Sequence, residues 1–134
     1  EHPDLAIEFL VPEKGRGSDK PFPLKELSIN AQPLRYLSLL TQRVINAEVE
    51  GVKISLPHPA VFAFHKLIVA QIRRNKDKEA KDKEQAVRIL RALIDKGELV
   101  ATKKFLNCML LKWQAKVLAS LKEMGELELL GALK

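Results

Sequence analysis

The stretch with the clearest alternation of apolar and polar positions, residues 57–97, predicts two helices joined by a charged bend. Apolar side chains recur at spacings of three and four in its first half, which gives a helix one buried stripe: Val61, Phe64, Leu67, Ile68 and Ile72. The second half has its own stripe: Ala86, Val87, Leu90, Leu93 and Ile94. Pro59 suits a first helical turn and Gly97 a C-terminal stop. The run NKDKEAKDKE between them predicts a solvated bend leading into the second helix, so we expect a helical hairpin over 58–97.

The segments before this hairpin have the composition of short strands and turns. Residues 5–12, LAIEFLVP, predict a strand, and residues 13–23, with two glycines and two prolines, predict a loop. Residues 27–31 predict a second short strand, after which Pro33 is expected to open a short helix, PLRYLSLLTQ. Residues 44–56 predict a β-hairpin with its tight turn at Glu50-Gly51. In that hairpin three apolar residues alternate on one face: Val52, Ile54 and Leu56.

A long amphipathic helix is predicted from Thr102 to about Lys122. Apolar side chains recur there every four residues: Phe105, Met109, Trp113, Val117 and Leu121. Five lysines keep to other positions: Lys103, Lys104, Lys112, Lys116 and Lys122. Such a stripe indicates core packing rather than a partner groove. Gly125 ends this helix, and ELELLGALK predicts a short final helix or a frayed end.

These elements predict an α+β fold, with a few short N-terminal strands followed by a helical hairpin and a C-terminal helical bundle. We expect a strand-rich part over 1–56 and a helical region over 57–134, with C-terminal helices over 102–134, packed as one unit. A chain of 134 residues suits a single domain. Because it opens at Glu1 without a methionine and passes at once into strand-like residues, we expect a fragment of a longer protein.

Charge gives the hairpin its functional interest. Between Lys66 and Arg91 lie nine Lys or Arg and four Asp or Glu, a local balance of +5 within +6 for the whole chain. Lys66 and Arg73 are seven residues apart, nearly two turns, so they point the same way. The same run also mixes signs as an exposed helix with four-apart ion pairs does. If the hairpin is only such a solvated surface, Asp82 merely pairs with Lys66 or Arg73. This alternative stays open.

The sequence contains no motif for several common kinds of binding or catalytic site. GRGS lacks the lysine and the spacing of a phosphate-binding loop. His58 and His65 have no cysteine or carboxylate at zinc spacing, and no Ser/His/Asp set stands out. The single cysteine, Cys108, excludes an internal disulfide and is expected to be a small buried hydrophobe. No apolar run approaches the ~20 residues of a membrane span, and no signal-peptide pattern occurs, so we expect a cytoplasmic protein without membrane contact.

A succession of short motifs resembles one protein family. IEFLVP, AQPLRYL, GVKISLPHPAVFAFHKLIVAQIRR and KEAKDKEQAVRIL follow one another as in the later part of bacterial nucleotidyltransferase-like proteins, within the DNA polymerase beta-type superfamily. The resemblance covers roughly residues 5–97. Its sharpest part is Pro59-x-x-Phe62-Ala63-x-His65-Lys66-Leu67, followed by Arg73, Arg74 and Lys81-Asp82-x-x-Gln85-Ala86.

The resemblance implies roles for individual residues. Glu8, between Ile7 and Phe9, matches the third of three carboxylates that hold two divalent ions, Mg²⁺ in the complete protein, around a nucleoside triphosphate. Cationic side chains match positions that meet the phosphates, where their charge favours nucleotidyl transfer: Lys66, Arg73, Arg74 and Lys81. Supporting positions are His65, Asp82 and Gln85.

The sequence also departs from the family pattern. The Gly-Ser turn and the Asp-x-Asp motif that precede the third carboxylate are missing before Glu8, and Gly17-Ser18 follows Glu8 in a loop with no Asp-x-Asp after it. We therefore expect a catalytically incomplete C-terminal part of a nucleotidyltransferase-like protein, its hairpin facing the triphosphate. No cofactor is expected to bind it tightly. The acceptor is open, either nucleic acid or protein. The alternative is a non-catalytic binding module whose hairpin contacts nucleic acid or an acidic protein.

Overall fold

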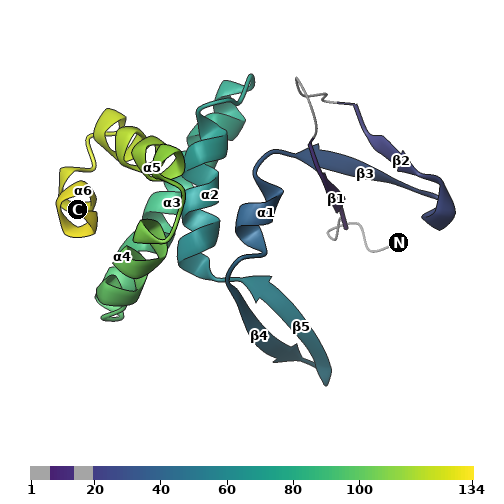
Figure 1. The fold of residues 1–134 in the computed structure, drawn as a ribbon, viewed down its shortest axis with the longest axis horizontal. Helices are drawn as coiled ribbons and strands as arrows, with labels where there is room; N and C mark the ends of the chain where they lie inside the picture. Colours follow the sequence, from purple (N-terminus) through teal and green to yellow (C-terminus); the bar gives the residue numbers. More distant parts are fainter. Residues whose placement is uncertain (1–6, 14–19) are drawn as a thin grey trace. The chain divides into compact units, whose positions relative to one another are not determined.

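The computed structural model describes residues 7–13 and 20–134 and divides the chain into two compact units, Glu1–Leu39 and Leu40–Lys134. Short strands in small sheets are followed by a set of helices, which confirms the predicted α+β class (Figure 1). The hairpin predicted over 44–56 groups with the helices, so the boundary between the units falls before residue 40. The two units are described separately below.

The first unit contains a three-stranded sheet with the order β1-β3-β2. Strand β1 (Phe9–Pro12) pairs in parallel with β3 (Ile29–Leu34), and β2 (Phe22–Leu24) pairs with β3 in antiparallel orientation. A 3-10 turn, η1 (Lys25–Leu27), connects β2 to β3. The predicted loop over 13–23 therefore ends in a strand, since β2 begins at Phe22, and residues 14–19 of that loop lie outside the described residues.

Pro33 does not open a helix as predicted, because it lies in β3 opposite Val11 of β1. Strand β2 pairs only with residues 29–31, so β3 has a single neighbour at Pro33 and tolerates the missing N–H. The helix that follows, α1 (Leu37–Leu40), is a single turn. Proline thus marked the last part of a strand here rather than the start of a helix.

The β-hairpin of the second unit is confirmed, with β4 (Val44–Val49) and β5 (Val52–Pro57) joined at the predicted turn. Glu50 and Gly51 both have positive φ, 51° and 79°, as a type I′ turn requires. Pairing places six apolar residues on one face: Ile45, Leu56, Ala47, Ile54, Val49 and Val52. The alternation was predicted correctly, but Val52 remains 61% exposed, so this face is not a buried one.

The helix α2 (Pro59–Ala70) begins at an unusual cap. Because Pro59 has no N–H to offer, the first donor in need of a partner is Ala60, and it donates to Nδ1 of His58 over 3.2 Å. The N–H of His58 donates in turn to the carbonyl oxygen of Arg43, before β4, over 2.8 Å. One histidine therefore fixes both the start of α2 and the base of the β-hairpin.

The second predicted helix is longer than its apolar stripe. Helix α3 (Lys76–Asp95) starts with Asn75 as N-cap, whose side chain accepts from the N–H of Lys78. The charged run NKDKEAKDKE is therefore helical, and the predicted bend there is wrong, because Asn75 and the acids of the first turn stabilise a helix start. Only residues 71–75 make the connection, and Ile72, predicted in the buried stripe, is exposed there.

The end of α3 is the predicted one. Gly97 has φ +77° and donates to Ile94, while Glu98 donates to Leu93, the two bonds of a Schellman motif. Gly125 closes a later helix in the same way, through bonds to Lys122 and from Glu126 to Leu121. Both glycines thus supply the left-handed residue that this stop needs.

The single long helix predicted from Thr102 to Lys122 is wrong. The chain forms α4 (Leu99–Asn107) and α5 (Leu111–Glu123), separated by three residues, and then α6 (Leu127–Leu133). Gln114 explains the break, since its amide donates to the carbonyl oxygens of Asn107 and Met109 at the end of α4. Cys108 lies in this break and is exposed, which corrects the expectation of a buried cysteine.

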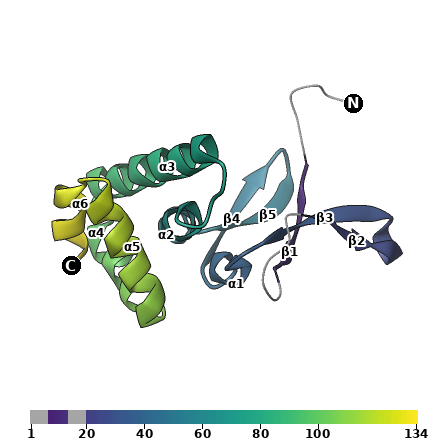
Figure 2. The ribbon, with the colours of Figure 1, turned by 90° about the horizontal axis from the view of Figure 1, so that it is seen from above.

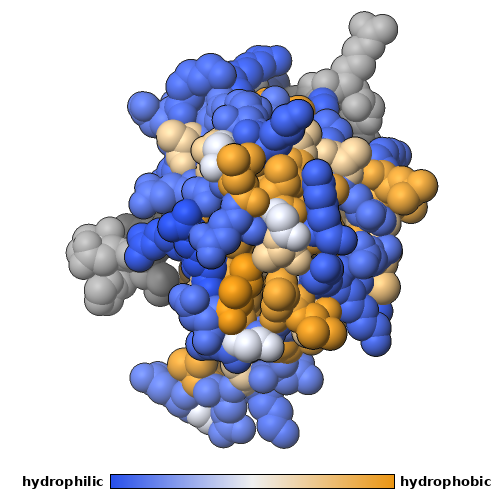
Figure 3. Space-filling view, turned by 90° about the vertical axis from the view of Figure 1, so that its left-hand side faces the viewer, coloured by the Kyte–Doolittle hydropathy of each residue, from blue (hydrophilic) through white to orange (hydrophobic). Residues whose placement is uncertain are grey.

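The core of the second unit forms where α2 packs along α3, with α5 and α4 against α2 (Figures 1 and 2). Phe64, Leu67, Leu90 and Val117 are fully buried in it. On the side where α4 and α6 lie, hydrophobic side chains also reach the surface in a strip bordered by hydrophilic ones (Figure 3). Within the described part of the chain, no helix is both long and apolar enough to cross a membrane.

Candidate functional site

The predicted phosphate-binding residues Lys66 and Arg73 meet at one carboxylate. Nζ of Lys66 lies 2.7 Å from Oδ1 of Asp82, and Nε of Arg73 lies 2.9 Å from Oδ2. The two cations come from the second half of α2 and the connection after it, and the acid comes from α3. Their convergence follows from packing α2 along α3, which brings Lys66 of α2 and Arg73 of the connection to the same turn of α3.

This triad of Lys66, Asp82 and Arg73 is an asymmetric charge cluster. Asp82 is 7% exposed, and two cations face its single negative charge. Ammonium carries three N–H bonds and guanidinium five, and the contacts with Asp82 occupy one of each. The side chains of Lys66 and Arg73 retain 16% and 36% exposure, so they reach solvent while the acid holds them in place.

An aromatic ring adjoins this triad. Nζ of Lys66 lies 5.0 Å from the ring centroid of Phe62, within cation–π range. Phe62 is one turn before Lys66 on α2 and is half-buried. The sequence did not single out this contact, although the four-residue spacing of Phe62 and Lys66 was a signal for it.

The remaining predicted residues lie at different distances from the surface. Arg74 is exposed in the 71–75 connection, and Lys81 is exposed on α3 beside Asp82. Gln85 is half-buried one turn further along α3. His65 is 4% exposed and faces the core side of α2. The structure brings Lys66, Arg73 and Asp82 together, and the convergence of Lys81 with them stays a prediction.

Glu8, the predicted metal ligand, is exposed and directly precedes β1 at the edge of the three-stranded sheet. Among residues 7–13 and 20–134, no three His, Cys, Asp or Glu side chains gather so that they can hold a metal ion. Gly17-Ser18 lies outside the described residues. Glu8 belongs to the first unit and the triad to the second, so their joint action also stays a prediction.

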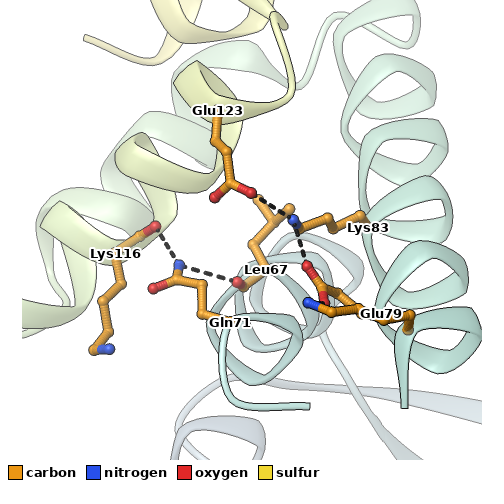
Figure 4. A network of polar contacts seen from close by, with 7 residues as sticks. Leu67, Gln71, Glu79, Lys83, Lys116 and Glu123 are labelled. Carbon is orange, nitrogen blue, oxygen red and sulfur yellow. Dashed lines mark hydrogen bonds and ion pairs between the residues drawn. The ribbon is translucent and has the colours of Figure 1, made fainter. Parts of the chain in front are cut away.

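A second polar network joins α3 to α5 (Figure 4). Lys83 donates to Glu79 over 2.8 Å and to Glu123 over 3.0 Å, and Lys76 donates to Glu79 over 2.7 Å. The hydrogen bonds from Lys76 and then Lys83 lower the pKa of Glu79 from 4.5 to about 2. The bond to Glu79 raises the pKa of Lys83 above its usual value. This network fixes helix packing, and its cations are engaged with acids of the chain.

Comparison with known protein families identifies the family of this chain. A family model described as Nucleotidyltransferase matches residues 1–105, which includes Glu8 and the whole triad. No curated protein and no solved structure matches the chain significantly. The family model covers well over half of the 134 residues. The chain therefore belongs to this nucleotidyltransferase family.

Proposed function

We propose that the α2–α3 hairpin of this nucleotidyltransferase-like protein binds the triphosphate of a nucleoside triphosphate. The observation that supports this is the triad, in which one buried carboxylate holds two cations side by side at the surface. Lys66 and Arg73 then keep N–H groups for phosphate oxygens, and Arg74 and Lys81 add positive charge nearby. A cation held before the ligand arrives loses less side-chain entropy on binding than a mobile one.

In this proposal Asp82 is a positioning residue rather than a competitor of the phosphates. Its negative charge lowers the total attraction for an anion, but it fixes where Lys66 and Arg73 present their donors. Charge-assisted hydrogen bonds to phosphate are roughly twice as strong as neutral ones when the geometry is right. His65, which is buried on α2, and Gln85, which is half-buried on α3, are supporting positions in this proposal.

The first prediction concerns Lys66. Titration of ATP with magnesium, and of inorganic triphosphate, at low salt should show weak, salt-sensitive binding by the 134-residue chain. Lys66→Ala should weaken both by about tenfold or more, since one hydrogen bond to a charged group is worth about 1.5–3 kcal/mol. Isothermal calorimetry measures both affinities.

The matched control is Lys78→Ala, which removes the same charge from an exposed position of α3. It should change the affinity by less than about twofold, because an exposed cation contributes mainly screened, long-range attraction. Equal affinity of the wild type and the Lys66→Ala protein would remove Lys66 from the site. Equal losses of affinity in the two variants would mean that triphosphate is held by general electrostatic attraction rather than at a specific site.

We further propose that these 134 residues are catalytically incomplete, with Glu8 as the third carboxylate of a Mg²⁺ site. Nucleotidyl transfer needs divalent ions held by several carboxylates, and no two of the five aspartates in the sequence stand in an Asp-x-Asp motif. Glu8 would supply one hard oxygen ligand, and the ions would offset the charge that develops on the transferred phosphate.

The second prediction follows from this incompleteness. Residues 1–134 should transfer no nucleotide to any acceptor, measured with radiolabelled triphosphate and magnesium. In a longer chain that carries the Gly-Ser and Asp-x-Asp part, Glu8→Ala and Lys66→Ala should both abolish transfer, and only Glu8→Ala should change the dependence on magnesium. Magnesium-dependent transfer by the 134 residues, or a longer enzyme that is indifferent to Glu8→Ala, would contradict the proposal.

A further inference from the structure

A second positively charged region, residues 99–122, differs from the hairpin in having no acids. These 24 residues contain five lysines and neither Asp nor Glu, a local balance of +5. In the described part of the chain, none of the five lies within ion-pair distance of a carboxylate. Their positive charge is therefore not compensated by these acids, and it can attract a polyanion from solution.

Three of these lysines lie along the outer side of α5. Helical spacing places them on one arc with two small residues between them: Lys112, Ala115, Lys116, Ala119 and Lys122. All are exposed except Lys116, which is half-buried. The opposite side of α5 packs into the core through Val117 and Leu121. We call the outer arc the α5 lysine stripe.

Contacts with neighbouring helices hold the stripe in place. The amide of Gln71, at the end of α2, donates to the backbone carbonyl of Lys116 over 2.7 Å, while the side chain of Lys116 extends away from Gln71 (Figure 4). Glu123 is the single acid of α5, and Lys83 of α3 binds it over 3.0 Å. The charge of Glu123 is thus balanced from α3.

We propose that the α5 lysine stripe binds the sugar–phosphate backbone of a nucleic acid. Alanines between the cations let a bulky polyanion approach the helix closely, and lysines contact phosphates without reading bases. An aromatic stacking platform is missing from the stripe, so the binding is independent of sequence. That this nucleic acid is also the acceptor of the nucleotide rests on the proposed function, whereas the binding itself does not.

The rival occupant of a basic helix is an anionic membrane. Such a helix places large apolar side chains between its cations and inserts them among the lipids. On α5 the corresponding positions are Ala115 and Ala119, and the large apolar residues Val117 and Leu121 face the core. Leu110 and Leu111 are exposed at the start of α5, but no further large apolar side chain in the rest of this helix is as exposed. The stripe therefore fits a phosphate backbone better than a lipid surface.

The third prediction tests the stripe with single-stranded oligonucleotides of about 20 nucleotides and mixed sequence. Fluorescence anisotropy at several salt concentrations gives the affinity and its salt slope. Replacing Lys112, Lys116 and Lys122 together by Gln should weaken binding at low salt by at least tenfold. The slope of log K against log salt should become shallower by about 2, since each lost single-strand phosphate contact removes about 0.7.

The matched control replaces three scattered exposed lysines by Gln: Lys53, Lys78 and Lys96. Both triple variants lower the formal net charge from +6 to +3, so they differ only in where the charge is lost. The control should lose less than about threefold in affinity and keep its salt slope. Circular dichroism checks that both variants stay folded.

The outcomes separate this proposal from its rivals and from the triphosphate site. Lys66→Ala should bind oligonucleotide as the wild type does, so a failure at the triad leaves this test intact. Equal losses in the two triple variants, or no oligonucleotide binding by the wild type at low salt, overturn the proposal. Stripe-dependent binding to vesicles with about a third phosphatidylserine, without oligonucleotide binding, assigns the surface to membranes instead.

Discussion

Residues 66–91 and residues 99–122 carry the same formal charge, +5, but they use it differently. In the first region at least six of the nine cations form ion pairs, with Asp82, Glu79, Glu84, Glu123 and Glu126 as acids. In the second, the described residues provide no such partner for any of five lysines. Two regions of equal net charge therefore differ: in the first, acids hold most of the cations in place, and in the second, the lysines have no such partners among the described residues.

This difference matters for the kind of ligand each region suits. Cations held by an acid present donors at defined places, which fits a small anion with a few oxygens, such as a triphosphate. Lysines without ion pairs along a helix can follow a long polyanion whose charges repeat, and their contribution falls steeply with salt. The two proposals of phosphate binding thus call for different responses to mutation, salt and pH.

The largest expected effect comes from Asp82→Asn, the fourth prediction, which removes the acid that holds the hairpin cations. Breaking a buried ion pair costs about 3–5 kcal/mol, and the partial exposure of Lys66 and Arg73 reduces this to about 1–3 kcal/mol of unfolding free energy. Urea denaturation measures the change. Asp95→Asn, at an exposed position in the last turn of α3, should change it by less than about 0.5 kcal/mol.

Ligand binding by Asp82→Asn also tests whether the two regions act differently. If Asp82 positions the two cations, Asp82→Asn weakens triphosphate binding although the net charge rises by one. If Asp82 only neutralises them, triphosphate binds more tightly. Oligonucleotide binding to the α5 lysine stripe should stay within twofold in either case. A parallel change of both ligands would erase the distinction between the two regions.

A smaller effect is expected from Glu79, the subject of the fifth prediction. Its pKa is about 2 in the folded chain against 4.5 unperturbed, so the contacts with Lys76 and Lys83 stabilise the fold fully above about pH 4.5. That contribution is lost progressively as the pH falls toward 2. Wild type should therefore melt higher than Glu79→Gln at pH 7, and the difference should vanish near pH 2.

The control for this pH profile is Glu84→Gln on the same helix. Glu84 is exposed, and its nearest partner, Arg88, lies 4.0 Å away, so its removal should leave the slope of melting temperature against pH nearly unchanged. A difference between wild type and Glu79→Gln that persists at pH 2 would mean that Glu79 acts through packing rather than charge. Scanning calorimetry between pH 2 and 7 measures all three proteins.

The parts of the fold that local rules determine were predictable from the sequence. The Glu50-Gly51 turn, the proline start of α2 and the Gly97 stop each depend on backbone conformations that few residues adopt. The apolar stripes of α2 and α3 depend on a three- to four-residue period. The approach of Lys66 and Arg73 to Asp82 was left as an open alternative, because sequence spacing does not determine which side of α3 faces α2.

The parts that were missed depend on tertiary contacts. Phe105, Met109 and Trp113 keep their four-residue spacing across the break between α4 and α5, and no glycine or proline marks it. The side chain of Gln114 donates to carbonyl oxygens at the end of α4 that lack a helical partner. No local sequence pattern predicts this contact. Cys108 is exposed for the same reason. Pro33 sits in a strand because β2 is too short to reach it, which only the sheet register reveals.

The cap that His58 forms on α2 selects one tautomer of its imidazole. Since Nδ1 accepts the N–H of Ala60, its lone pair points at the helix, and the proton of the neutral ring sits on Nε2. The ring also lies 4.6 Å from that of Phe105, at an angle of 59°. The junction between the β4–β5 hairpin and the first turn of α2 therefore depends on the tautomer of a single histidine.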